Sequence, residues 1–124
     1  MNDPYKNYKD NSINTMTRGE QLILLLDKAV QRLTIVSLMM EDGNFTEAII
    51  NLNKTRDIFN YLMACLDKKF EFATDLLQLY SFINAEIVKA AGKKDKTAID
   101  NLIPIVIELR DTWKEAEKLA RINK

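Results

Sequence analysis

The side chains that could carry out chemistry in this 124-residue chain are few, because it contains no histidine and only one cysteine. Cys65 lies among apolar neighbours in the stretch Leu62–Leu66. A catalytic thiolate usually needs a nearby base that activates it, and histidine, the commonest base, is missing. We therefore expect Cys65 to be a small buried hydrophobic residue in a reducing compartment.

The remaining reactive groups are carboxylate pairs such as Glu41 with Asp42 and Glu115 with Glu117. They flank lysines at helix-surface positions and are most simply solvated faces. Di-iron sites in helical bundles need Glu-x-x-His pairs, and each of the three glycines is too isolated for a phosphate-binding loop. The sequence therefore predicts no cofactor, no metal site and no enzymatic activity.

Composition and charge narrow the classes of partner. Hydrophobic residues make up 47% and charged residues 29% of the chain, as in ordinary globular proteins. The 18 basic and 18 acidic residues balance, which gives no electrostatic reason to expect nucleic acid or an anionic membrane. The polar N-terminus lacks a secretory signal, and the longest apolar run, Leu22–Leu26, is too short to span a bilayer. We expect a cytoplasmic protein without direct membrane insertion.

Apolar residues at spacings of three and four predict four amphipathic helices. Their expected bounds are about residues 17–42, 45–67, 72–91 and 97–122. Amphipathic helices joined by short turns pack best as an antiparallel bundle, so the predicted fold is an all-α four-helix bundle of one domain. Residues 1–16 are mostly polar and are expected to form an extended N-terminal arm outside the bundle.

Local signals set the expected helix ends. Thr17 to Glu20 has the form of a capping box, and Gly43 can supply the left-handed residue that ends the first helix. Gly92 is expected to close the third helix, Thr97 to start the fourth, and Pro104 to bend it.

No glycine or proline separates the second helix from the third, so one continuous helix over residues 45–91 is the alternative. Such a helix would be roughly 70 Å long at 1.5 Å per residue, which is too long for a small compact domain.

The fourth helix carries the only tryptophan of the chain on its main apolar stripe. Trp113 follows Leu109 by four residues, and the same stripe continues to Ala116 and Ala120. We expect Trp113 to be a structural anchor of the bundle and not to contact a partner.

The helices hold more apolar residues than the roughly three in seven that an inward face needs. The surplus residues are Ile50, Ile58, Tyr61, Leu77, Phe82, Val88, Ile105 and Ile107. Large exposed apolar patches usually mark interaction sites, so this surplus predicts a groove for a partner helix. Scattered surface residues or a self-association face are the alternatives.

Seven short segments share residues, order and spacing with one known family over nearly the whole chain. They are Asp3–Thr15, Thr17–Leu22, Leu25–Ala29, Asn51–Thr55, Leu62–Asp67, Leu79–Phe82 and Leu109–Lys114. The last of them, Leu-Arg-Asp-Thr-Trp, is similar to the hallmark Leu-Arg-Asp/Glu-Ala-Trp of that family. Together they resemble the FliS family of flagellin-specific export chaperones.

The resemblance implies a four-helix-bundle chaperone that binds the C-terminal helical region of flagellin. Family members keep that region from polymerising prematurely in the cytoplasm and aid its delivery to the flagellar type III export apparatus. An export-gate membrane protein would then be a further partner of the loaded chaperone. The alternative is a generic four-helix homodimerising interaction module unrelated to flagellar export.

The predicted flagellin-binding residues lie off the main stripes of the second and third helices. They are Ile58, Tyr61, Leu77 and Phe82. Core packing alone does not require side chains at these positions, which makes them candidates for contact with a partner.

The arm is punctuated by Tyr5, Tyr8 and Ile13. The resemblance implies that this tyrosine segment covers part of the substrate site and moves when flagellin arrives, with Tyr8 as its best match. The alternative is a disordered tail, because termini commonly fray unless they are tied down.

Overall fold

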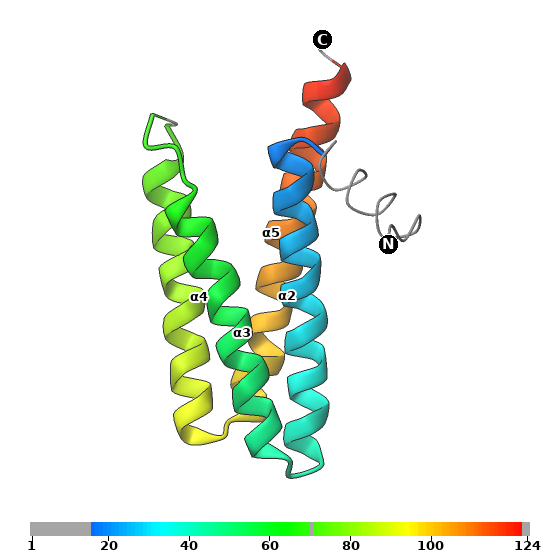
Figure 1. Ribbon diagram of the computed structural model, residues 1–124, viewed down its shortest axis with the longest axis vertical. Helices are drawn as coiled ribbons and strands as arrows, with labels where there is room; N and C mark the ends of the chain where they lie inside the picture. The colour runs from blue at the N-terminus through cyan, green and yellow to red at the C-terminus, as the bar shows by residue number, and fades with distance from the viewer. Residues whose placement is uncertain (1–15, 70, 123–124) are drawn as a thin grey trace, which may run out of the picture.

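The computed structural model describes residues 16–69 and 71–122 of the chain. Within them lie four helices, α2 (Arg18–Glu41), α3 (Phe45–Ala64), α4 (Ala73–Lys93) and α5 (Lys96–Ile122). They run antiparallel in chain order, each joined to the next by a short connection (Figure 1). The predicted all-α four-helix bundle is confirmed, whereas the arm lies almost wholly outside the described residues.

Capping side chains start the first two helices. The Thr17 hydroxyl accepts a hydrogen bond from the Glu20 amide at 3.1 Å, which is one half of the predicted capping box. The Glu20 carboxylate pairs with Arg121 and does not form the other half. Asn44 does the same for Glu47 at 3.5 Å. Gly43 adopts a left-handed backbone with φ of 76°, so the predicted end of the first helix is confirmed.

The turn between α4 and α5 differs from the prediction in two ways. Gly92 does not close α4, because the helix continues to Lys93 and Lys94 takes the left-handed conformation with φ of 52°. The Lys94 ammonium lies 5.3 Å from the centre of the Phe45 ring, a cation–π contact that supports this backbone. The cap of α5 is then Asp95, whose carboxylate accepts from the Ala98 amide at 3.2 Å, and not Thr97.

Residues 45–91 form two separate helices, α3 and α4, and not the single continuous helix that was the alternative. α3 ends at Ala64, three residues before the predicted end. The Asp67 carboxylate accepts a hydrogen bond from the Lys69 amide at 3.0 Å, a local bond that competes with helix geometry. Cys65 is the residue that follows the end of α3, and it is exposed, so the expectation that it is buried was wrong.

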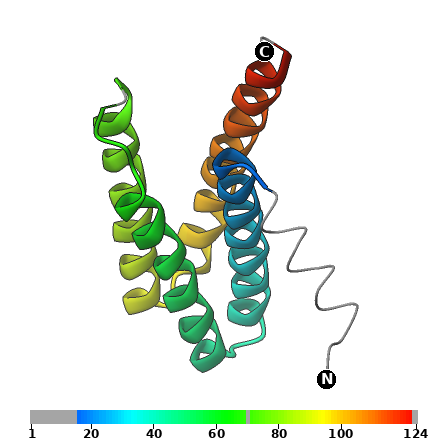
Figure 2. The ribbon, with the colours of Figure 1, turned by 45° about the horizontal axis from the view of Figure 1, so that its top comes forward.

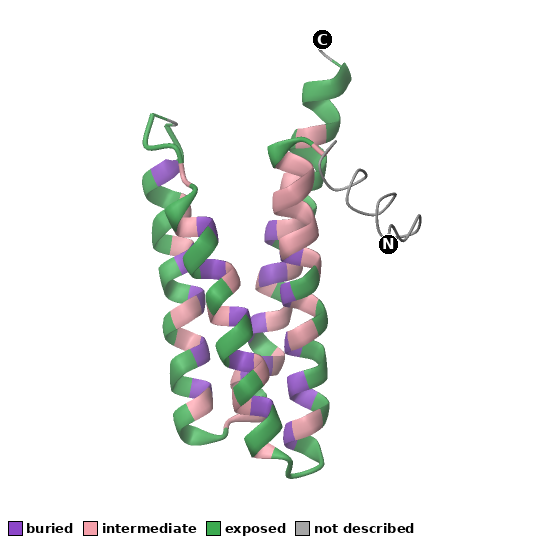
Figure 3. Ribbon diagram, in the orientation of Figure 1, coloured by how far each residue is buried: buried purple, intermediate pink, exposed green. Residues whose placement is uncertain are grey.

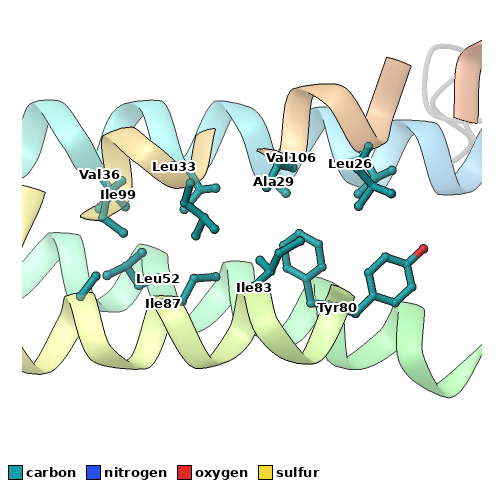
Figure 4. Close-up of a cluster of buried hydrophobic side chains, with 14 of the residues drawn as sticks. Leu26, Ala29, Leu33, Val36, Leu52, Tyr80, Ile83, Ile87, Ile99 and Val106 are labelled. Carbon is teal, nitrogen blue, oxygen red and sulfur yellow. The ribbon is translucent and has the colours of Figure 1, made fainter. Parts of the chain in front are cut away.

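The core consists of the predicted apolar stripes of all four helices (Figures 3 and 4). Its fully buried side chains include Leu26, Leu33, Val36, Leu52, Phe59, Tyr80, Ile83, Ile87, Ile99 and Val106. The rings of Phe59 and Tyr80 contact each other with centroids 6.0 Å apart. At about 25 cal/mol per Å² of apolar surface removed from water, burial of such side chains is the main stabilising contribution.

The stripe of α5 leaves the core earlier than the sequence suggested. Leu109 is buried and Trp113 is partly buried, but Ala116 and Ala120 are exposed, contrary to prediction. The reason is that α5 extends past the start of α2 (Figures 1 and 2). Phe72 is likewise exposed, because it precedes the first residue of α4.

The helices pair unevenly. α2 packs closely against both α3 and α5, whereas α4 packs less closely against α5 than against α3. Figures 1 and 2 show the α3–α4 pair diverging from the α2–α5 pair toward the end where α2 begins and α5 ends. None of the helices in the described part of the chain is long and apolar enough to cross a membrane.

Candidate partner-binding surface

Large apolar side chains are exposed on all four helices. Those of the described residues are Ile35, Leu38, Ile50, Tyr61, Phe72, Leu77, Phe82, Val88, Leu119 and Ile122. Three of the four predicted contact residues belong to this set, with Tyr61 56%, Leu77 44% and Phe82 47% exposed. The fourth, Ile58, is partly buried and packs against the core.

Leu77 and Phe82 lie on different sides of α4. They are five residues apart, which at 3.6 residues per turn rotates their side chains by about 140°. Leu77 shares its side with Ser81 and Asn84, and this side meets α3. The contacts there are a 3.4 Å approach of the Ser81 hydroxyl to the Met63 sulfur and a 2.9 Å hydrogen bond from Asn84 to Asn60.

Ile58 and Tyr61 are three residues apart and share one side of α3. Cys65, one turn further on, raises the pKa of the Tyr61 hydroxyl, and the positive charge of Arg18 partly opposes the shift. Because Leu77 and Phe82 lie on different sides of α4, the four predicted residues do not line one groove. A single partner could contact all of them only by passing around the α3–α4 pair.

Trp113 occupies the end of the core cluster, next to Tyr80. It is partly buried against the core residues of the bundle. Burial raises the pKa of the Tyr80 hydroxyl, and the neighbouring Trp113 indole partly opposes the shift. The indole approaches this hydroxyl without reaching hydrogen-bond geometry, and no other described residue bonds to it. Figure 4 shows it at the edge of the cluster.

Polar contacts that fix α5 against α2 were missed by sequence reasoning. Arg110 of the Leu-Arg-Asp-Thr-Trp segment pairs with Asp27 of α2 at 3.2 Å, across 83 residues of sequence. Farther along, the Ser37 hydroxyl donates a short hydrogen bond to Asp100, which also pairs with Lys96 at 2.6 Å. Asp27 and Arg110 both stand in the segments that carry the family resemblance, which was the available signal.

The three predicted arm residues, Tyr5, Tyr8 and Ile13, lie outside the described residues. Within residues 16–69 and 71–122, no group of three or more histidine, cysteine, aspartate or glutamate side chains comes together that could hold a metal ion.

Comparison with known proteins gives one consistent family. The family described as "Flagellar protein FliS" matches residues 1–120. The flagellar secretion chaperone FliS of Bacillus subtilis (strain 168) is 26% identical over 116 residues, covering 94% of this chain and 87% of that protein. Its counterpart from Vibrio cholerae is 28% identical over 106 residues, covering 84% and 78% of the two chains.

A solved structure gives the same fold. The crystal structure of a bacterial flagellar chaperone superposes with a TM-score of 0.78 and 18% sequence identity. The superposition covers 92% of this chain and 94% of that one. At this identity the likeness concerns the arrangement of the helices.

Proposed function

The chain belongs to the FliS family of flagellar proteins, and from this premise we propose that it is a cytoplasmic chaperone that binds the C-terminal helical region of flagellin. The observation that carries the proposal is the family match over residues 1–120. The relatives in Bacillus subtilis, Vibrio cholerae and Escherichia coli are named flagellar secretion chaperones. In this role the protein binds and releases its substrate and catalyses no reaction.

The surface chemistry supports a helical partner with an apolar stripe. Tyr61, Leu77 and Phe82 each leave about half of the side chain exposed, and burying such area against another apolar surface is favourable. Apolar faces of a helical partner, laid on more than one side of the bundle, would cover these residues. Since they lie on different sides of the α3–α4 pair, we propose that the flagellin segment wraps around this pair.

Covering its polymerisation surface would keep bound flagellin monomeric in the cytoplasm. The loaded complex would then be delivered to the export gate of the flagellar type III apparatus, a membrane protein that recognises the pair. For the arm, we propose that Tyr5, Tyr8 and Ile13 cover part of the exposed apolar surface until flagellin displaces them. Any free energy that holds the arm in place is subtracted from the affinity for flagellin.

A charge placed in the proposed surface tests the proposal. The variant Phe82→Lys puts an ammonium group where apolar contact is expected, and should weaken binding of a flagellin C-terminal segment at least tenfold in calorimetric titration. The fold should persist, because Phe82 is 47% exposed. Gln31→Lys, at an exposed position of α2, adds the same charge elsewhere and should bind like the parent chain.

Two results would count against this assignment. Unaltered affinity of Phe82→Lys would remove Phe82 from the contact surface. A parent chain that forms a stable homodimer and does not bind flagellin would favour a self-associating interaction module instead.

A further inference from the structure

The last turns of α5 extend beyond the hydrophobic core and do not pack against it. After Trp113 the helix continues to Ile122, yet Leu119 is 50% and Ile122 67% exposed. Helix ends with little buried apolar surface usually open at small free-energy cost. Other contacts must therefore hold this segment, and the described residues offer a polar set at the start of α2.

The Glu117 carboxylate lies at the N-terminus of α2. The Thr17 hydroxyl donates a 2.8 Å hydrogen bond to its Oε1 while accepting the 3.1 Å capping bond from the Glu20 amide. The first amides of a helix lack intrahelical partners and carry partial positive charge, so a carboxylate is stabilised there. One turn further along α5, Arg121 forms a short ion pair with Glu20.

Gly19 makes room for this carboxylate. A Cβ atom built at Gly19 would lie 2.1 Å from Oε2 of Glu117, far inside contact distance. The backbone conformation does not require glycine, because only Gly43 among the glycines has a positive φ. Gly92, also inside a helix, would have nothing within 4 Å of its added Cβ. Glycine weakens a helix relative to alanine, and at position 19 its missing Cβ leaves the space that the Glu117 carboxylate occupies.

We propose that Thr17, Gly19, Glu20, Glu117 and Arg121 form a clasp that holds the projecting end of α5 against the start of α2. Glu117 is its positioning residue. By fixing this end, the clasp orients the exposed side chains of Leu119 and Ile122 as part of the partner-binding surface. This last step rests on the proposed function, whereas the clasp itself does not.

The clasp predicts a specific coupling between two substitutions. In Gly19→Ala the new methyl group displaces the flexible Glu117 side chain, and in Glu117→Ala the carboxylate is absent. Each should speed amide hydrogen exchange of residues 114–122 by roughly three- to tenfold, the range expected for one or two partly exposed polar contacts. The double variant should show no further increase, because both changes remove the same contact.

Matched controls separate this effect from general destabilisation. Gly92→Ala makes the same substitution in open space, and Glu115→Ala removes an exposed carboxylate two residues from Glu117. Both should leave exchange of residues 114–122 unchanged. Unchanged exchange in Gly19→Ala, or additive effects in the double variant, would overturn the clasp.

Affinity for the flagellin C-terminal segment tests the positioning step. Glu117→Ala should weaken binding several-fold with little change in melting temperature. Glu117→Gln, whose side-chain oxygen can still accept from Thr17, should recover part of the affinity. A released α5 end with unchanged affinity would overturn the positioning role. Failure of the parent chain to bind flagellin would instead refute the proposed function, while the exchange experiment would still decide the clasp.

Discussion

Replacement of Trp113 by alanine tests where the core of this bundle ends. A fully buried tryptophan cut to alanine costs about 3–5 kcal/mol. Trp113 is only partly buried, at the end of the cluster beyond Leu109 and beside Tyr80, so the cost should fall to about 2–3 kcal/mol. For a domain of this length, that loss corresponds to a melting temperature about 6–15 °C lower.

Circular dichroism is the appropriate assay, because Trp113 is the only tryptophan and its removal abolishes the intrinsic tryptophan signal. Urea titration followed at helical wavelengths should give the lower free energy of unfolding with a two-state transition. Leu119→Ala is the matched control on the same helix. It removes a side chain that is 50% exposed, and should change stability by less than about 0.5 kcal/mol.

The opposite pattern would contradict a structural role of Trp113. If Trp113→Ala keeps the melting temperature of the parent chain and loses binding to flagellin, Trp113 contacts the partner and does not anchor the bundle.

Two further predictions concern polar groups of the described residues. Tyr80→Phe should be neutral or stabilise the protein by up to about 1 kcal/mol in urea titration, because it removes a buried hydroxyl that has no partner among them; a loss above 1 kcal/mol would show that the hydroxyl is bonded. Hydrogen bonds from Lys96, then Ser37, lower the pKa of Asp100 below its ordinary 3.8, so its ionised form stabilises the fold above that pH and the benefit is lost as pH falls through the folded value. Asp100→Asn should therefore lower the free energy of unfolding by less than about 1 kcal/mol at pH 7. The difference in free energy of unfolding between the variant and the parent chain should shrink below pH 3.8. A difference that does not change with pH would contradict the stabilising role of the ionised Asp100.

The helices and their inward faces were predictable because they depend on local periodicity. Leu26, Leu33 and Val36 repeat at helical spacing and are fully buried, and the capping bond of Thr17 follows from a four-residue pattern. These features need no information about distant parts of the chain.

The errors occurred where two local signals compete. At the end of α4, Gly92 and Lys94 lie two residues apart. The left-handed residue is Lys94, although glycine adopts a positive φ with less strain. Asp95 then caps α5 in place of Thr97. Tertiary surroundings such as the Phe45 ring next to Lys94 select between such alternatives, and periodicity carries no information about them.

The surface was harder to predict than the core. Glu117 was interpreted as part of a solvated face, yet it bonds to Thr17 across 100 residues of sequence. The spacing of Leu77 and Phe82 places them on different sides of α4, but it does not reveal that the Leu77 side is the one that meets α3. Contacts between distant segments depend on how far one helix extends past another, and that is set by the whole fold.

In the proposed role, this protein should hold flagellin in a monomeric complex through the C-terminal region of flagellin. Sedimentation of a mixture with full-length flagellin, under conditions in which flagellin alone polymerises, tests it most directly. A one-to-one complex and no filaments are expected, with binding lost when flagellin lacks its C-terminal helical region. Separate sedimentation of the two proteins with undiminished filament formation would contradict it.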